Sequence, residues 1–197
     1  MFEEELEALY PKIKEVCMNY YISGERKSLY ELLEECMGVE GMPMHCPPHH
    51  FMIPAVLLTM CHQAEGDLPE DLEADLREAN ERAHHVLGGF CGNYGSCGAA
   101  VGTGIFMSIY TQSGPCSEGT WSWTNRIVAK ALMEISELDG PRCCKRNSYL
   151  AMKSACESVR QYLQIELDWP QQISCHYFTD NHECIKEKCP FYPKKGI

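Results

Sequence analysis

The chain has 197 residues, of which 45% are hydrophobic and 23% are charged, a composition that predicts a folded protein and excludes disorder along the whole chain. Its 17 basic and 28 acidic residues give a formal net charge of -11. The overall charge therefore excludes binding to nucleic acid or to an anionic membrane through the net field of the protein, and leaves a local basic patch as the alternative. Thirteen cysteines are the unusual feature of the composition.

The expected compartment follows from the first residues and from the apolar runs. The opening sequence MFEEELEALY has neither the basic nor the apolar stretch of a secretory signal. The longest apolar runs, residues 53–60 and 105–109, are too short to span a bilayer. We therefore expect a cytoplasmic protein. Thiols are kept reduced there, and cysteines bind metal, carry redox or sulfur chemistry, or pack in the core.

Apolar residues recur at helical spacing along most of the chain, and no segment alternates as a strand does. Helices are expected at residues 2–21, 28–37, 49–63, 69–85, 96–111, 120–138 and 144–167. Ser28 and Glu31 form the capping box of the second helix. The third helix is apolar on nearly all sides and is expected to be buried. Small residues from Gly98 to Gly104 predict close approach of another backbone or a cofactor.

These patterns predict an all-α fold with two parts. Residues 1–167 form a single bundle-like domain of about six or seven helices. Residues 168–197 form a short irregular tail, rich in cysteine and histidine, that packs on this domain. The tail has too little apolar mass for a core of its own, so it is expected to bind a metal.

The first cysteine group is Cys91 and Cys97, which lie in a glycine-rich turn that enters a helix. The free N–H groups and the dipole of a helix N-terminus favour a thiolate. We interpret the two cysteines as redox partners or metal ligands. The alternative is a glycine turn with two thiols packed in the core.

The second group is the pair Cys143 and Cys144, flanked by Arg142, Lys145 and Arg146 at the start of a helix. The helix dipole disfavours cations at this end, so an anionic ligand, substrate or cluster is expected beside them. The three cations are assigned to cofactor binding. The alternative is a solvated basic surface with one buried cysteine.

The third group is the tail set Cys175, Cys184 and Cys189, with His176 and His182 between them. A structural zinc ion with three cysteines and a histidine fits this set. An iron–sulfur cluster also fits, since a Cys-Pro ending occurs in bacterial ferredoxin spacing. The expectation is that the three cysteines converge on one centre, helped by a histidine or by a cysteine from the helical domain. The alternative is a disordered tail with spare thiols.

Histidines gather at the turn before the buried helix, together with Cys46. Neutral imidazoles at this position ligate a metal or move protons, so His45, His49 and His50 are candidate general bases. For any one of them, capping and packing is the alternative. The remaining histidines and helical cysteines are interpreted as structural. These are His62, His84, His85, Cys17, Cys36, Cys61 and Cys156.

Together these motifs resemble an uncharacterised prokaryotic family, domain of unknown function 5714. The resemblance rests on His45 with His49 and His50, on residues 91–104, on Trp121 and on residues 140–146. Where this chain has Cys46, that family usually has glycine. Residues 91–102 are also similar, more weakly, to small redox proteins named for a GCAxxG motif. The resemblances imply an all-helical, anaerobe-associated protein with redox or metal chemistry, and they imply no particular reaction.

The favoured function is a redox or sulfur-handling protein that uses clustered cysteine thiolates and an iron–sulfur cluster, with 4Fe–4S favoured. The predicted metal ligands are Cys91, Cys97, Cys143, Cys144, Cys175, Cys184 and Cys189. The predicted catalytic residues are Cys91, Cys97, Cys143, Cys144, His45, His49 and His50. The turn at Cys91 and Cys97 is expected to face the turn at Arg142 to Cys144 across a pocket, with the histidines as a third wall.

Partners and alternatives follow from this function. Expected partners are a redox protein or a sulfur donor or acceptor protein, and a small anionic substrate. An oxidoreductase or a sulfur transferase would both fit. One alternative is a thiol or persulfide enzyme with no metal in its centre. The other is a zinc-stabilised accessory protein that docks on an enzyme.

Overall fold

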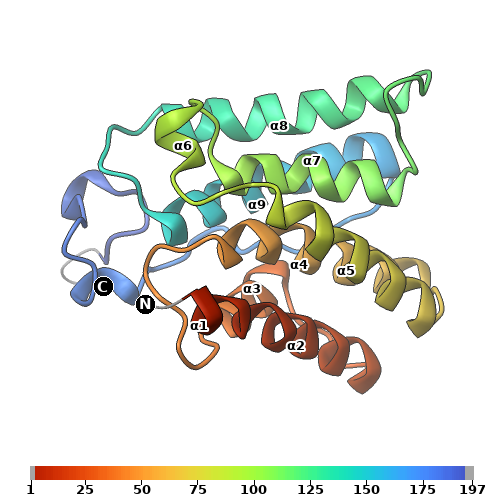
Figure 1. The fold of residues 1–197 in the computed structure, drawn as a ribbon, viewed down its shortest axis with the longest axis horizontal. Coiled ribbons are helices and arrows are strands. Elements are labelled where there is room, and N and C mark those ends of the chain that lie inside the picture. The colour runs from red at the N-terminus through yellow and green to blue at the C-terminus, as the bar shows by residue number, and fades with distance from the viewer. Residues whose placement is uncertain (1–2, 194–197) are drawn as a thin grey trace.

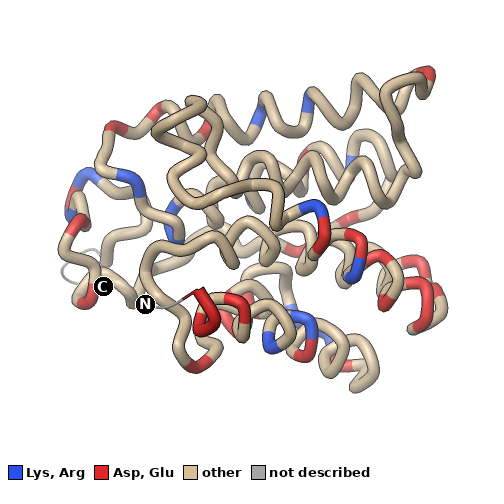
Figure 2. The backbone as a smooth tube through the Cα atoms, viewed as in Figure 1, with Lys and Arg blue, Asp and Glu red and all other residues tan. Residues whose placement is uncertain are grey.

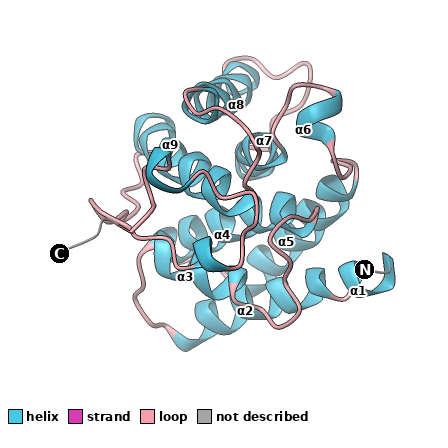
Figure 3. Ribbon diagram, turned by 90° about the vertical axis from the view of Figure 1, so that its left-hand side faces the viewer, coloured by secondary structure: helices cyan, strands magenta, loops and turns pink. Residues whose placement is uncertain are grey.

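Every regular element that the computed structural model describes, over residues 3–193, is helical, which confirms the all-α prediction for this range (Figures 1 and 3). The elements are α1 (Glu3–Glu7), α2 (Leu9–Ser23), α3 (Leu29–Met37), α4 (Pro48–Glu65), α5 (Pro69–His84), α6 (Phe90–Asn93), α7 (Gly98–Tyr110), α8 (Thr120–Ser136), α9 (Cys144–Leu163) and the 3-10 turns η1 (Tyr177–Thr179) and η2 (Lys186–Lys188). Three parts of our predictions lie outside the described range. They are the helix start at Phe2, the first residue of the helical domain and tail residues 194–197.

The buried helix α4 is the centre of the bundle. Each of its residues from Pro48 to His62 is buried, as its apolar sequence predicts. It contacts α2, α3, α5, α7 and α9. The other elements therefore pack around one helix, and residues at the start of α4 lie at the edge of the core.

Three helices begin at the same end of the bundle. In Figure 1, α4, α7 and α9 all start at the left and run to the right, and α5 and α8 return in the opposite direction. Figure 3 views the molecule from that left end, where the connecting loops gather. The first turn of a helix has N–H groups without helical partners, so this end collects three sets of free donors.

The small residues of α7 allow close helix packing. A Cβ atom added at Gly98 would lie 2.1 Å from Cδ2 of His50, and one at Gly102 would lie 2.8 Å from Cβ of Ile53. A Cβ atom at Gly104 would lie 2.4 Å from Val128. The close approach was predicted correctly, and the neighbours are side chains of α4 and α8.

Several helix boundaries differ from those expected. Residues 90–93 form the short helix α6 where a turn was expected, and α9 ends at Leu163 because Gln164 adopts a left-handed φ of 61°. Pro11 lies in the first turn of α2, where its missing N–H has no helical acceptor to lose. The capping box of Ser28 and Glu31 is present as predicted.

The tail packs on the helices through apolar and aromatic residues, of which Phe191 is the most buried. Phe191 is buried, and its ring centroid lies 5.1 Å from that of Tyr149 on α9. The Cys175 N–H donates to the Phe191 carbonyl over 2.7 Å, which joins the two ends of the tail. The tail is thus held against the start of α9 by contacts with the core of the helical domain.

Candidate functional site

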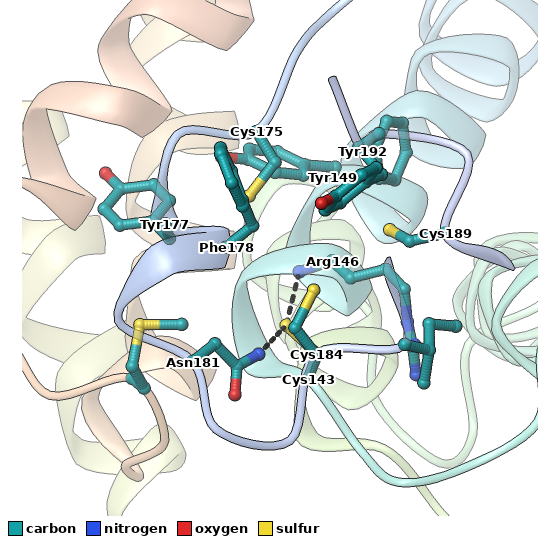
Figure 4. A pocket seen from close by; sticks show the side chains of 13 residues that line it. Cys143, Arg146, Tyr149, Cys175, Tyr177, Phe178, Asn181, Cys184, Cys189 and Tyr192 are labelled. Carbon is teal, nitrogen blue, oxygen red and sulfur yellow. Dashed lines mark hydrogen bonds between the residues drawn. The ribbon is translucent and has the colours of Figure 1, made fainter. Parts of the chain in front are cut away.

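Cys143 is the N-cap residue of α9, and its thiol is almost fully enclosed. Its Sγ accepts from the Arg146 N–H at 3.4 Å and from the side-chain amide of Asn181 at 3.5 Å (Figure 4). Burial raises the pKa of the Cys143 thiol, while the Arg146 N–H opposes the rise. Two donors are therefore already directed at this sulfur, and both would stabilise a thiolate.

Four cysteines line one cavity between α9 and the tail, which we call the tail cavity. Cys143 comes from the start of α9, and Cys175, Cys184 and Cys189 come from three points along the tail (Figure 4). The cavity has a volume of about 20 Å³, close to that of one water-sized sphere. The tail cysteines therefore meet a cysteine from the helical domain, which is one of the two arrangements expected for them.

The histidines of the tail do not line this cavity. His176 pairs with a carboxylate oxygen of Glu34 at 3.2 Å, and His182 is exposed. In residues 3–193, no group of three or more His, Cys, Asp and Glu side chains is arranged to hold a metal ion as it stands. Metal binding by the tail stays a prediction.

Cys144 lies on a different side of the helix start from Cys143. Its backbone N–H donates to Nδ1 of His45 at 3.4 Å. Burial raises the pKa of Cys144 to about 12, and the neighbouring thiols of Cys97 and Cys46 add to the rise. Cys143 is the extended N-cap residue and Cys144 is the first helical residue. The two adjacent cysteines belong to different sulfur groups, since Cys143 lines the tail cavity and Cys144 lies near Cys97 and Cys46.

A second and larger cavity, which we call the open pocket, lies beside α6 and the end of α8. It has a volume of about 900 Å³ and is lined by both Cys91 and Cys97 and by Arg142, Arg146 and Asn147. The side-chain amide of Asn147 donates to Sγ of Cys97 at 3.4 Å. The turn at Cys91 and Cys97 therefore faces Arg142 as expected, whereas Cys143 lies in the tail cavity. The single pocket that we expected is divided into two, and Arg146 lines both. The three histidines that we expected as a third wall, His45, His49 and His50, line neither of these two cavities.

Two cations at the start of α9 are buried. Lys145 is 1% exposed and Arg146 is 5% exposed. The Lys145 ammonium donates to the Met37 carbonyl at 3.1 Å, and Arg146 donates to the Pro141 carbonyl at 3.1 Å. Within residues 3–193 neither forms an ion pair with a carboxylate. Burial lowers the pKa of Lys145 to about 8. The solvated basic surface that we considered is therefore wrong for these two residues.

Arg142 differs from its two neighbours. Its side chain is half exposed, and its guanidinium lies 3.7 Å from Oε2 of Glu183. It lines the open pocket only. Of the three predicted cofactor-binding cations, Arg142 thus faces solvent in the larger cavity, and Lys145 and Arg146 lie inside the protein.

The histidine segment is close to the thiols, and its three members have different surroundings. Nε2 of His45 lies 3.3 Å from Glu183 Oε2, and Nδ1 of His49 lies 3.1 Å from Cys46 Sγ. His50 donates to the Val86 carbonyl at 2.8 Å and packs against α7. Burial lowers the pKa of all three imidazoles, most strongly at His49. They are therefore neutral at pH 7, as a ligand or a general base requires.

Sequence reasoning missed the polar side chains that contact the sulfurs. Asn147 follows Cys144 by three residues on α9 and so lies on the same helix face, a signal that could have been used. Asn181 and Glu183 reach the start of α9 from the irregular tail. No spacing rule predicts those contacts, because they depend on how the tail folds back.

The fold and this site define an all-helical protein with two groups of free thiols around one helix N-terminus. The chain matches the model of the family of unknown function DUF5714 over residues 13–192, and it therefore belongs to that family. No curated protein and no solved structure matches it. These comparisons lend no support to the weaker similarity to GCAxxG proteins. Within the described residues, every helix is too short or too polar to cross a membrane.

Proposed function

We propose that this protein is a redox or sulfur-handling protein that holds an iron–sulfur cluster in the tail cavity. The ligands would be the thiolates of Cys143, Cys175, Cys184 and Cys189. Four cysteines are the usual ligand set of a 4Fe–4S cluster, which supplies one-electron chemistry when bound. The residues around the cavity hold the thiolates and the tail in place.

The observation that carries the proposal is that Lys145 and Arg146 are buried and, among residues 3–193, form no ion pair with a carboxylate. A buried charge that is not paired costs several kcal/mol. Four thiolates around a cluster would bring net negative charge to the start of α9, beside Arg146, which lines the cavity, and near Lys145, on which Cys143 acts electrostatically. This compensation explains why an acidic protein keeps two cations inside its fold at this position.

We favour a cluster over zinc because a cluster accepts ligands that stand farther apart. A zinc ion binds all its thiolates at about 2.3 Å, so its ligand atoms must lie close together. In the described part of the chain no such group exists. The four cysteines of a cluster bind different iron atoms and stand farther apart. A cluster is larger than a cavity of about 20 Å³, so we expect the tail to move outward when it binds.

The free state of the cysteines supports a reducing compartment. All thirteen cysteines are unpaired, including the exposed Cys116. Cytosolic proteins keep thiols in this form, so we assign the protein to the cytoplasm of an anaerobic cell. Electrons or sulfur would pass to a partner protein or a small substrate through the other thiols, Cys91, Cys97 and Cys144. His45 is the imidazole hydrogen-bonded to the Cys144 backbone.

The test is anaerobic purification of the full chain, followed by iron, zinc and sulfide analysis and a visible spectrum. We expect iron and sulfide in equal amounts in the wild type. Cys143→Ser and Cys184→Ser should lose both, and Cys116→Ser, which changes a cysteine outside the cavity, should keep both. Zinc in place of iron would overturn the cluster and favour an accessory protein. A protein free of metal would overturn it in favour of a thiol enzyme.

A further inference from the structure

We propose that the open pocket binds a small anionic disulfide, which Cys91 and Cys97 reduce as a dithiol. This proposal deepens the redox function above by naming a substrate class. It rests on that function for its biological setting, but its chemistry uses only residues of the open pocket and does not require the cluster.

The first observation is that two thiols share one accessible cavity. Cys91 lies in α6, Cys97 is the N-cap residue of α7, and both are partly exposed in the wall of the open pocket. Gly92 and Gly95 lie between them, and Gly95 has a φ of +66°. Glycines give this segment the freedom to bring the two sulfur atoms together.

The second observation is that hydrogen-bond donors lie beside the sulfur of Cys97. The Asn147 amide donates to its sulfur, and the free N–H groups of the first turn of α7 lie at the same point. Both stabilise negative charge on sulfur, and the thiolate is the form that attacks a disulfide. By this geometry Cys97 is the attacking thiol and Cys91 is the resolving thiol.

The third observation is the charge of the pocket. Arg142 and Arg146 line it, and the guanidinium of Arg142 is held only by the long 3.7 Å contact with Glu183 among the described residues. A guanidinium binds carboxylate or phosphate oxygens through two parallel hydrogen bonds. Leu132, Ile135 and Leu138 line the same pocket. The pocket thus fits a ligand with an anionic group and an apolar body.

The size of the pocket agrees with this class of ligand. Its volume of about 900 Å³ lies within the range of roughly 300–1,000 Å³ typical of small-molecule sites. A peptide-bound disulfide would need a longer groove. A low-molecular-weight disulfide with carboxylate groups can place its charge near Arg142 and its sulfur atoms near Cys97.

The proposed reaction is two successive thiol–disulfide exchanges. The Cys97 thiolate attacks one sulfur of R–S–S–R, forms a Cys97–S–S–R mixed disulfide and releases the first R–S⁻. The Cys91 thiolate then attacks the Cys97 sulfur, forms the Cys91–Cys97 disulfide and releases the second R–S⁻. The two cysteines lose two electrons and the substrate gains them, while the two thiol protons pass to solvent.

The experiment uses the full chain, purified anaerobically, with Cys116→Ser as the background. The anionic probe is 5,5′-dithiobis(2-nitrobenzoate), which releases a coloured thiolate, and the neutral probe is 4,4′-dithiodipyridine. Peptide mass mapping follows each cysteine separately. We expect the anionic probe to produce a Cys91–Cys97 disulfide, and Cys91→Ser to stop at the mixed disulfide on Cys97.

The charge requirement is tested with Arg142→Gln. We expect the anionic probe to react about fivefold more slowly at Cys97, in line with loss of one exposed ionic contact, and the neutral probe to keep its rate. Arg126→Gln, an exposed arginine of α8 outside the pocket, should change neither rate. Equal slowing of both probes, or wild-type protein that retains the mixed disulfide, would overturn the proposal.

Failure of this proposal is distinguishable from failure of the cluster. A protein that is free of metal but shows the charge-dependent exchange overturns the cluster and supports the open pocket. A protein that contains iron and sulfide but forms no Cys91–Cys97 disulfide supports the cluster and overturns the dithiol.

Discussion

The buried basic side chains at the two ends of the bundle differ in whether they contact carboxylates. At the end of α4, His62 is 6% exposed and lies between two carboxylates, 2.7 Å from Asp67 and 2.9 Å from Asp75. At the start of α9, Lys145 and Arg146 are equally buried, and within residues 3–193 neither forms an ion pair with a carboxylate. The Lys145 ammonium contacts the Met37 carbonyl and lies 4.5 Å from the centroid of the Tyr177 ring, and Arg146 has carbonyl and amide partners. Acidic positions are frequent along α5, which supplies Asp75 (Figure 2). The chain thus has carboxylates to pair with a buried cation, and it places thiols instead at the start of α9.

The difference indicates that charge at the two ends serves different purposes. His62 finds both of its carboxylate partners, Asp67 and Asp75, within the chain, and its contact with Asp75 connects α4 to α5. On the function we propose, the charge at the start of α9 would be balanced by nearby thiolates, which metal binding would form. Lys145→Met and His62→Gln test this contrast, and Gly98→Ala tests the helix packing beside the sulfurs. They are given from the largest expected effect to the smallest.

Lys145→Met removes a buried cation and retains the apolar volume of its side chain. We expect the stability gained on loading with iron and sulfide to fall by about 3 kcal/mol, the size of effect seen when one member of a buried ion pair is removed. Denaturant unfolding of the loaded and metal-free forms measures the gain. Lys153→Met, at an exposed position of the same helix, is the control. An unchanged gain in Lys145→Met would contradict charge balance by the thiolates.

Gly98→Ala tests the contact that brings α4 and α7 together beside the sulfurs. The added Cβ atom would lie 2.1–2.5 Å from three atoms of the His50 ring, so we expect a loss of about 2 kcal/mol in the free energy of unfolding. Urea denaturation measures it. A Cβ atom at Gly114 meets nothing within 4 Å, so Gly114→Ala is the matched control. Equal stability of the two variants would show that the helix starts are farther apart.

His62→Gln tests the contacts of His62 with Asp67 and Asp75 through the pH dependence of the unfolding free energy. Burial alone lowers the pKa of His62, but the Asp75 and Asp67 carboxylates outweigh it and raise the pKa above its ordinary value. The stabilisation by protonated His62 is therefore full below the unfolded-state pKa of about 6.5 and is lost as the pH rises through the folded-state pKa. We expect His62→Gln to cost about 1.5 kcal/mol at pH 6 and less at pH 9.

The matched control for this pH series is His85→Gln, at an exposed position just after α5. Its unfolding free energy should follow that of the wild type at each pH. A constant cost of His62→Gln from pH 6 to pH 9 would show that the ring matters for packing rather than for its charge.

Much of the helical fold could be predicted because its signals are local. Helical spacing located the long helices, the apolar sequence of α4 predicted its burial, and the Ser28 capping box was found where expected. The end of α9 was placed at residue 167 instead of Leu163, since no glycine or proline marks the left-handed residue Gln164. For the candidate site, the sequence identified the thiols and cations as residue types in an unusual pattern.

The grouping of those thiols was decided only by the tertiary structure. Cys143 and Cys144 are adjacent in sequence, but the side chains of consecutive residues at a helix start diverge, and different segments pack on each side. The tail covers one side and adds three cysteines, while the turns before α4 and α7 cover the other. Local sequence therefore determined the helices and the chemistry available, and long-range packing determined which sulfur atoms share a cavity.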